Sequence, residues 1–186
     1  IGFECFVDDG KLHFRKPPSS GTTVTLSWGK DLIAFFPSMT LAEQVDSVEV
    51  KSWNPKTATV ILGQAQTGAL YPQNGDSKNG ARWAATFGTG KHTFVDIPVA
   101  TQAEASKIAE ARLNELSGAF VSAEGTAIRC PSIKAGQFVQ LQSLGTRMSG
   151  KYMVTSATHT FSKEGLYTKF NVSGARTGLL TEQMAH

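Results

Sequence analysis

The strongest constraint on the fold is the order of elements in the second half of the sequence, where one capped helix precedes a series of short strands. Residues 101–116 (TQAEASKIAEARLNEL) show a helical pattern, and Thr101 with Glu104 three positions later matches a capping box. Gly118 is expected to end this helix in a left-handed conformation. Alternating apolar and polar residues then predict strands at 119–128, 137–143, 151–161 and 166–173. This order predicts a mainly β fold: a small closed or nearly closed β-barrel flanked by one helix.

The first half of the sequence predicts strands in pairs. Residues 1–7 and 11–16 alternate around Asp8-Asp9-Gly10, a sequence typical of a hairpin turn. Further strands are expected at 24–28, 31–36, 45–53 and 59–62. Residues 63–90 are rich in Gly, Asn, Gln, Thr and Ser, which predicts an inserted subdomain or a surface loop. The chain starts at Ile1 within a strand pattern, so we expect it to be part of a longer protein.

Composition narrows the classes of function. Hydrophobic residues make up 40% and charged residues 18% of the chain, as in an ordinary globular protein. The net charge of +3 comes from scattered lysines and arginines, so it does not predict a nucleic-acid-binding patch. Cys5 and Cys130 have no metal-ligand spacing; one disulfide is possible, but two buried free thiols are expected. No apolar run has the length of about 18 residues that a membrane span needs.

The motifs that carry chemistry are absent or incomplete. Residues 88–91 (GTGK) resemble the end of a phosphate-binding loop, but Ala85 stands where the motif needs glycine and His92 where it needs Ser or Thr. Four histidines have no partner at ligand spacing: His13, His92, His159 and His186. No nucleophile elbow occurs. The sequence therefore predicts no catalytic, cofactor-binding or metal-binding residues, and a protein that is not an enzyme.

One alternative arises from aromatic residues in the predicted strands. Basic strands with aromatic side chains can bind single-stranded nucleic acid by stacking. The residues that raise this alternative are Phe138, Tyr152, Phe161, Tyr167 and Phe170, with Lys151, Lys163 and Lys169 nearby. Core packing accounts for most of these aromatics and is the favoured interpretation. A nucleic-acid-binding β-barrel is thus kept as an alternative function.

Three ordered segments resemble the late control protein D family of contractile phages, whose hub fold is shared with VgrG proteins. They are residues 6–18 (FVDDGKLHFRKPP), 45–65 (VDSVEVKSWNPKTATVILGQA) and 100–175, which begins ATQAEASKIAEARLNEL and ends YTKFNVSGA. The resemblance implies a baseplate hub of a contractile injection system. In such a hub three chains, each with two tube-type β-barrels, form a pseudo-sixfold ring between the tail tube and the spike.

The resemblance also implies a division into domains. Residues 1–16 would end an inserted β domain, and 17–44 would close the first tube barrel. Residues 45–174 would form the second tube barrel, with 63–95 as its insertion, and 175–186 a C-terminal tail. A spike-base domain after the tail is left open.

The implied partners are other copies of the chain in a homotrimer, the tail tube protein, and the spike and baseplate proteins, in a virion tail or injection particle. DNA or an effector would pass through the lumen without specific binding. Predicted interface residues lie on strands taken as exposed edges and in the C-terminal tail: Val48, Val50, Trp53, Gln137, Val139, Arg176 and Leu179. Ordinary core packing, or a disordered terminus, is the alternative for each. A hub that also has cell-wall hydrolase activity is a second alternative function.

Overall fold

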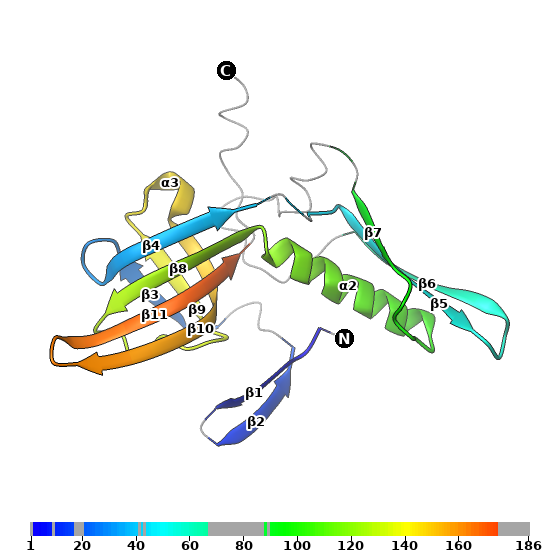
Figure 1. Cartoon of the computed structure of the whole chain (residues 1–186), viewed down its shortest axis with the longest axis horizontal. Helices are drawn as coiled ribbons and strands as arrows, with labels where there is room; N and C mark the ends of the chain where they lie inside the picture. The colour runs from blue at the N-terminus through cyan, green and yellow to red at the C-terminus, as the bar shows by residue number, and fades with distance from the viewer. Residues whose placement is uncertain are drawn as a thin grey trace.

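A computed structural model describes residues 2–8, 10–16, 21–40, 42, 44–66, 88 and 90–174. Within these ranges the chain forms three β-sheets, one long helix and one four-residue helix (Figure 1). The elements are β1 Glu4–Asp8, β2 Lys11–Arg15, β3 Thr23–Ser27, β4 Leu32–Met39, β5 Ser47–Asn54, β6 Thr59–Ala65, β7 Lys91–Phe94, α2 Gln102–Gly118, β8 Val121–Ile128, β9 Phe138–Gln142, α3 Gly145–Met148, β10 Gly150–Ser162 and β11 Gly165–Gly174.

The largest sheet has six strands in the order β3-β9-β10-β11-β8-β4 and curls into a half-barrel (Figure 1). Strand β8 shows that one face of this sheet encloses a core, because its residues alternate between buried and less buried positions. The buried residues of the interior come from every strand and from the adjoining loops: Leu26, Leu32, Phe35, Phe120, Val121, Ala123, Ala127, Ile133, Val139, Leu141, Tyr152, Val154, Phe170 and Val172. The predicted mainly β fold is confirmed.

Gly125 makes room for Phe170, the largest buried side chain on the neighbouring strand β11. Gly125 pairs with Phe170 in the register of β8 and β11. A Cβ atom at Gly125 would lie 2.4 Å from the Phe170 ring. Phe170 therefore occupies the space that any other residue at position 125 would fill, and its own exposed fraction is 1%.

Among the described residues, the outer strands of the half-barrel meet at the turn that joins them. Strands β3 and β4 end the sheet on its two sides, and a single bridge joins Trp28 to Leu32 at the turn between them. Strand β3 joins the sheet by parallel pairing with β9, with Thr23 opposite Phe138. This long-range pairing, together with the pairing of β4 with β8, puts β3 and β4 into the same sheet as β8, β9, β10 and β11. The predicted domain boundaries, which concern a longer protein, stay a prediction.

The second sheet has three strands in the order β6-β5-β7, with α2 across one face (Figure 1). Its core comprises Val48, Val50, Ile61, Val99, Ala105, Ile108, Ala109 and Leu113. The closest approach is at Gly63, where a Cβ atom would lie 2.1 Å from the carbonyl carbon of Ala105. Backbone therefore meets backbone here, which only glycine allows.

The helix starts as predicted and ends differently. Thr101 Oγ1 accepts a hydrogen bond from the Glu104 amide at 3.2 Å, and Glu104 Oε2 accepts one from the Ala100 amide at 2.9 Å. The expected left-handed Gly118 is wrong: Gly118 is the last helical residue, and the Ala119 cap has a right-handed φ of −74°. The end is closed instead by a tighter turn, in which the Ala119 amide donates to the Leu116 carbonyl.

The predicted first hairpin is confirmed. Strands β1 and β2 pair antiparallel, with Asp8 opposite Lys11. Gly10 has a φ of +70°, which a two-residue hairpin loop requires. The hairpin has no other strand partner in the described part of the chain.

Candidate interaction surfaces

Three of the predicted interface residues lie in the interior of the chain. Val48, Val50 and Val139 have exposed fractions of 0%. The strands that carry them are not edges: β5 lies between β6 and β7, and β9 lies between β3 and β10. The expectation that these strands are exposed edges is therefore corrected, and core packing, the alternative, describes the placement of the three valines.

The other predicted interface residues have different surroundings. Trp53 is 58% exposed on β5, and Gln137 is partly buried just before β9. A role at an interface stays a prediction for these two. Arg176 and Leu179 lie outside the described residues.

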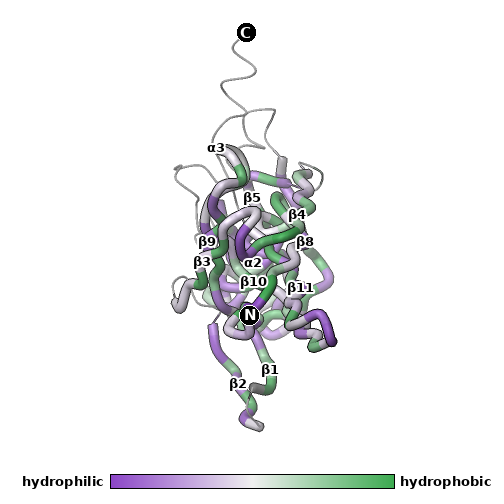
Figure 2. The backbone as a smooth tube through the Cα atoms, turned by 90° about the vertical axis from the view of Figure 1, so that its left-hand side faces the viewer, coloured by the Kyte–Doolittle hydropathy of each residue, from purple (hydrophilic) through white to green (hydrophobic). Residues whose placement is uncertain are grey.

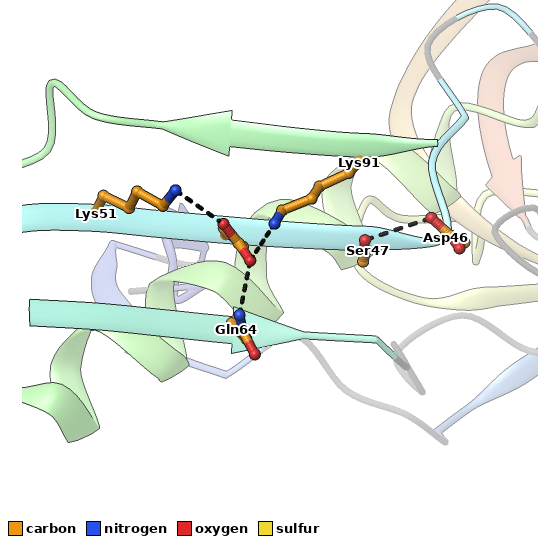
Figure 3. Close-up of polar contacts among 6 residues, drawn as sticks. Asp46, Ser47, Lys51, Gln64 and Lys91 are labelled. Carbon is orange, nitrogen blue, oxygen red and sulfur yellow. Dashed lines mark hydrogen bonds and ion pairs between the residues drawn. The ribbon is translucent and has the colours of Figure 1, made fainter. Parts of the chain in front are cut away.

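A polar cluster surrounds Glu49 on the sheet face opposite α2 (Figure 3). Glu49 Oε1 accepts a hydrogen bond from Gln64 Nε2 at 2.6 Å and forms an ion pair with Lys91 Nζ. Lys51 Nζ lies 3.4 Å from Glu49 Oε2. The three partners stand on β6, β7 and β5, so one carboxylate connects all three strands of the sheet.

The charges in this cluster stabilise the ionised form of Glu49. The Lys91 ammonium is the main cause of a lowered pKa of the Glu49 carboxyl, with Gln64 and Lys51 acting in the same direction and desolvation opposing them. The cluster has no nucleophile beside a base, so its geometry fits a clasp between strands better than a catalytic site. Lys91 of the GTGK sequence is used here, in a strand and not at the start of a helix.

The remaining candidate groups also have structural partners. His13 stacks on Phe6 and His92 on Phe94, with ring centroids 5.0 and 4.4 Å apart. His159 Nδ1 lies 2.9 Å from Thr168 Oγ1. His186 is outside the described residues. Among the residues that the structure describes, no group of three His, Cys, Asp or Glu side chains has the arrangement of a metal site.

Both cysteines are free thiols. Cys5 is exposed on β1, which corrects the expectation that both are buried. Cys130 is partly buried, donates to the Ile128 carbonyl at 3.2 Å, and has a pKa raised by burial. A raised pKa disfavours the reactive thiolate, so Cys130 has the environment of a packing residue.

The free edges of the sheets are protected to different degrees. At β6, the side-chain amide of Gln102 pairs with both backbone groups of Leu62: the Leu62 amide donates to Gln102 Oε1 at 3.3 Å, and Gln102 Nε2 donates to the Leu62 carbonyl. Strand β4 contains Pro37, which removes one donor from that edge. Residues 155–162 of β10 pair only with β11 and contain no Asp, Glu, Lys, Arg or Pro. This last edge lacks the usual protection against pairing with another chain.

The hairpin has one uncovered apolar face. Residues on this face are largely exposed: Phe3 42%, Val7 69%, Leu12 71% and Phe14 68%. Figure 2 shows the hairpin extending away from the rest of the molecule. An isolated two-stranded hairpin is marginally stable in water, so this face has the character of a contact surface.

Two smaller patches place an exposed aromatic ring beside a charge. Trp53 pairs across the strands with Val60, which is 63% exposed, and Lys51 and Lys56 flank Trp53 in sequence. On the outside of the half-barrel, Phe36 is 68% exposed and pairs with the exposed Glu124. Sequence reasoning identified Trp53 but missed Phe36, whose outward orientation depends on a β-bulge between Leu32 and Ala34.

Comparison with known protein families finds one family model that matches most of the chain. Residues 1–163 match the family model of the Alg8 N-terminal domain. The chain belongs to this family. The family name differs from that of the late control protein D family, to which the sequence showed a resemblance. No curated protein matches the sequence at a significant level.

Solved structures share the fold with this Alg8 N-terminal domain. The 43 kDa tail protein of prophage MuSo2 from Shewanella oneidensis has a TM-score of 0.66 at 15% identity, over 92% of this chain and 50% of that one. A tail protein from Neisseria meningitidis has a TM-score of 0.65 at 12% identity, over 95% and 54% of the two chains. A chain of the virion of a native gene transfer agent particle has a TM-score of 0.54 at 19% identity, over 95% and 36%. The chain therefore has the fold of phage tail proteins and spans about half the length of the first two.

No helix in the described part of the chain combines the length and the apolar character that crossing a bilayer requires.

Proposed function

We propose that the chain is a structural part of the baseplate hub of a contractile phage tail or a related injection particle. Three copies of the full-length protein would form a pseudo-sixfold ring that connects the tail tube to the spike. The fold likeness to tail proteins over more than nine-tenths of the chain is the observation that carries this proposal. The resemblance of three ordered segments to late control protein D supports the finer assignment to a hub.

The surfaces of the chain support a role in assembly. The uncovered apolar face of the hairpin and the unprotected edge of β10 are features that pair with other chains. We infer that the hairpin at 1–16 ends an inserted β domain, which would cover its apolar face. On the same mapping, 17–44 closes the first tube barrel, 45–174 forms the second with its insertion at 63–95, and 175–186 is a tail.

The proposed place of action is the virion tail or injection particle, with tail tube, spike and baseplate proteins as partners. DNA or an effector would pass through the lumen without specific binding. The protein would not be an enzyme. A zymogram on bacterial cell walls tests the hydrolase alternative, and clearing by the purified protein would contradict a purely structural role.

Three of the five aromatic rings that raised nucleic-acid binding as an alternative are buried in the half-barrel, whereas Phe161 is 85% exposed. Phe138, Tyr152 and Phe170 have exposed fractions of 0–1%, so their rings are not available to bases. Titration with single-stranded DNA at two salt concentrations checks this, and a salt-dependent affinity would favour the alternative.

The hub proposal is tested on the full-length protein. Electron microscopy should show rings, and light scattering after size exclusion should give the mass of a trimer. A full-length protein that stays monomeric at high concentration, without rings, would overturn the proposal.

A further inference from the structure

The outer face of the three-stranded sheet has an uncovered apolar pair. Helix α2 covers the face that carries Val48 and Val50, so the alternating residues Lys51 and Trp53 point to the other side. Trp53 and Val60 lie opposite each other in register and are each more than half exposed. We call Trp53, Val60 and Lys56 the tryptophan patch.

The tryptophan patch is basic at its border. Lys51 lies 3.4 Å from Glu49 and is partly neutralised by it. Lys56 stands in the turn between β5 and β6, and no ion pair of Lys56 occurs among the described residues. The uncompensated positive charge therefore comes from Lys56, close in sequence to the exposed Trp53.

A second uncovered patch has the opposite charge. Phe35 points into the half-barrel with an exposed fraction of 9%, so its neighbour Phe36 points outward. Phe36 lies opposite Glu124, an exposed carboxylate without an ion pair among the described residues. Asn171 lies opposite Glu124 on β11, and Lys169, which lies opposite Thr126, is two register pairs away. We call Phe36 and Glu124 the phenylalanine patch.

We propose that the tryptophan patch of one copy of this chain docks on the phenylalanine patch of a second copy. The rings would bury each other, and Lys56 would face Glu124. Apolar area at the centre with complementary charge at the rim is the usual composition of a specific interface. This proposal rests on the proposed ring and names the contact between its neighbouring copies.

The two patches lie on opposite sides of α2, one on β4 and β8 and the other on β5 and β6 (Figure 1). Because they are different surfaces, the contact is heterologous. Each copy keeps one free patch after docking, so copies can add in one direction until rotation closes the ring.

The test uses two single variants and a mixture of them. Trp53→Gln destroys only the tryptophan patch, and Phe36→Gln destroys only the phenylalanine patch. We expect each variant alone to associate roughly 30-fold more weakly than the wild type, as for a central aromatic hot spot. Their equimolar mixture should form a dimer that does not grow further, because one intact patch of each kind remains. Light scattering after size exclusion measures all three samples.

The control is Val95→Gln, which removes a 71% exposed apolar side chain between β7 and α2, outside both patches and the β10 edge. This variant should assemble as the wild type does. Circular dichroism should show that all three variants fold.

A charge exchange gives an independent readout. Lys56→Glu and Glu124→Lys should each weaken association, and the double variant should recover most of it, because the attraction is restored with reversed sign. No recovery in the double variant would contradict the facing of these two charges.

The outcomes separate this contact from the hub proposal. Rings that persist in Trp53→Gln and Phe36→Gln would overturn the contact and leave the ring intact. A mixture that stays monomeric would also overturn it. A wild type that is monomeric, and assembles only with another tail protein, would overturn the contact and the self-assembled ring together.

Discussion

The half-barrel and the helix-covered sheet shield their apolar cores from water in different ways. The six-stranded sheet encloses its core by bending, so its stability depends on how side chains such as Phe170 fill the interior. The three-stranded sheet is too small to bend around a core. Helix α2 covers one of its faces instead, and the two backbones are in close contact at Gly63. The half-barrel therefore depends most on the volume of a side chain at Phe170, whereas the helix-covered sheet depends most on the absence of one at Gly63.

The largest expected effect is in the half-barrel. Phe170→Ala would leave a cavity that the surrounding strands cannot fill, because position 125 is already glycine. We expect a loss of about 3 to 5 kcal/mol in the free energy of unfolding. Urea denaturation measures it, with Phe161→Ala as the control that removes an exposed ring and should change stability by less than about 0.5 kcal/mol.

The matching test in the other region adds a single methyl group. Gly63→Ala would place Cβ 2.1 Å from the Ala105 carbonyl carbon, and neither backbone can yield without moving the helix. We expect a loss of about 3 kcal/mol. Gly21→Ala is the control, since its Cβ would have 3.8 Å to the nearest atom. Equal stability of the two variants would show that α2 is not seated on β6 as described.

A smaller effect on stability is expected at the N-terminus of α2. Thr101→Ala removes the acceptor for the Glu104 amide and should cost about 1 kcal/mol. Hydrogen exchange should increase first in α2 and β6 and leave β11 protected, if the two regions open separately. Uniform loss of protection in both would show instead that they unfold as one unit.

The smallest effect on stability is expected from the polar cluster of Glu49 with Gln64, Lys51 and Lys91, and this effect depends on pH. The pKa of Glu49 is lower in the folded chain than its ordinary value of 4.5, so ionised Glu49 contributes stability at neutral pH. This contribution is fully present above 4.5 and is lost as the pH falls through the lower folded pKa. Stability followed from pH 7 to acid should therefore decrease less in Glu49→Gln than in the wild type. Glu164→Gln, in an exposed turn, should behave as the wild type.

Local patterns in the sequence predicted the elements well, but they did not predict which strands pair over long separations. The capping box at Thr101 and the alternation along β8 depend on neighbours within a few residues, and both were confirmed. The parallel pairing of β3 with β9 joins residues more than a hundred positions apart, and no local pattern encodes it. The same limit explains why Val48 and Val139 were expected at edges: strand order decides which strand has two partners.

Surface residues were harder to predict than elements. Trp53 follows from simple alternation along β5, but the direction of Phe36 is set by a bulge that shifts the register of β4 by one residue. The polar cluster around Glu49 connects β5, β6 and β7, and its member Lys91 follows the 63–90 stretch in the sequence. Its members become a cluster only when the three strands pair.

The pairing of Gln102 with Leu62 has a consequence for synthesis of the chain on the ribosome. Strand β6 is complete about 40 residues before Gln102 is added. At typical translation rates that interval lasts roughly 2 to 8 s. During this time the amide and carbonyl of Leu62 lack their Gln102 partner. The nascent sheet can then pair with a neighbouring chain on the same messenger RNA. The yield of soluble protein should therefore depend on how fast this stretch is translated, even if the final stability of the chain does not change.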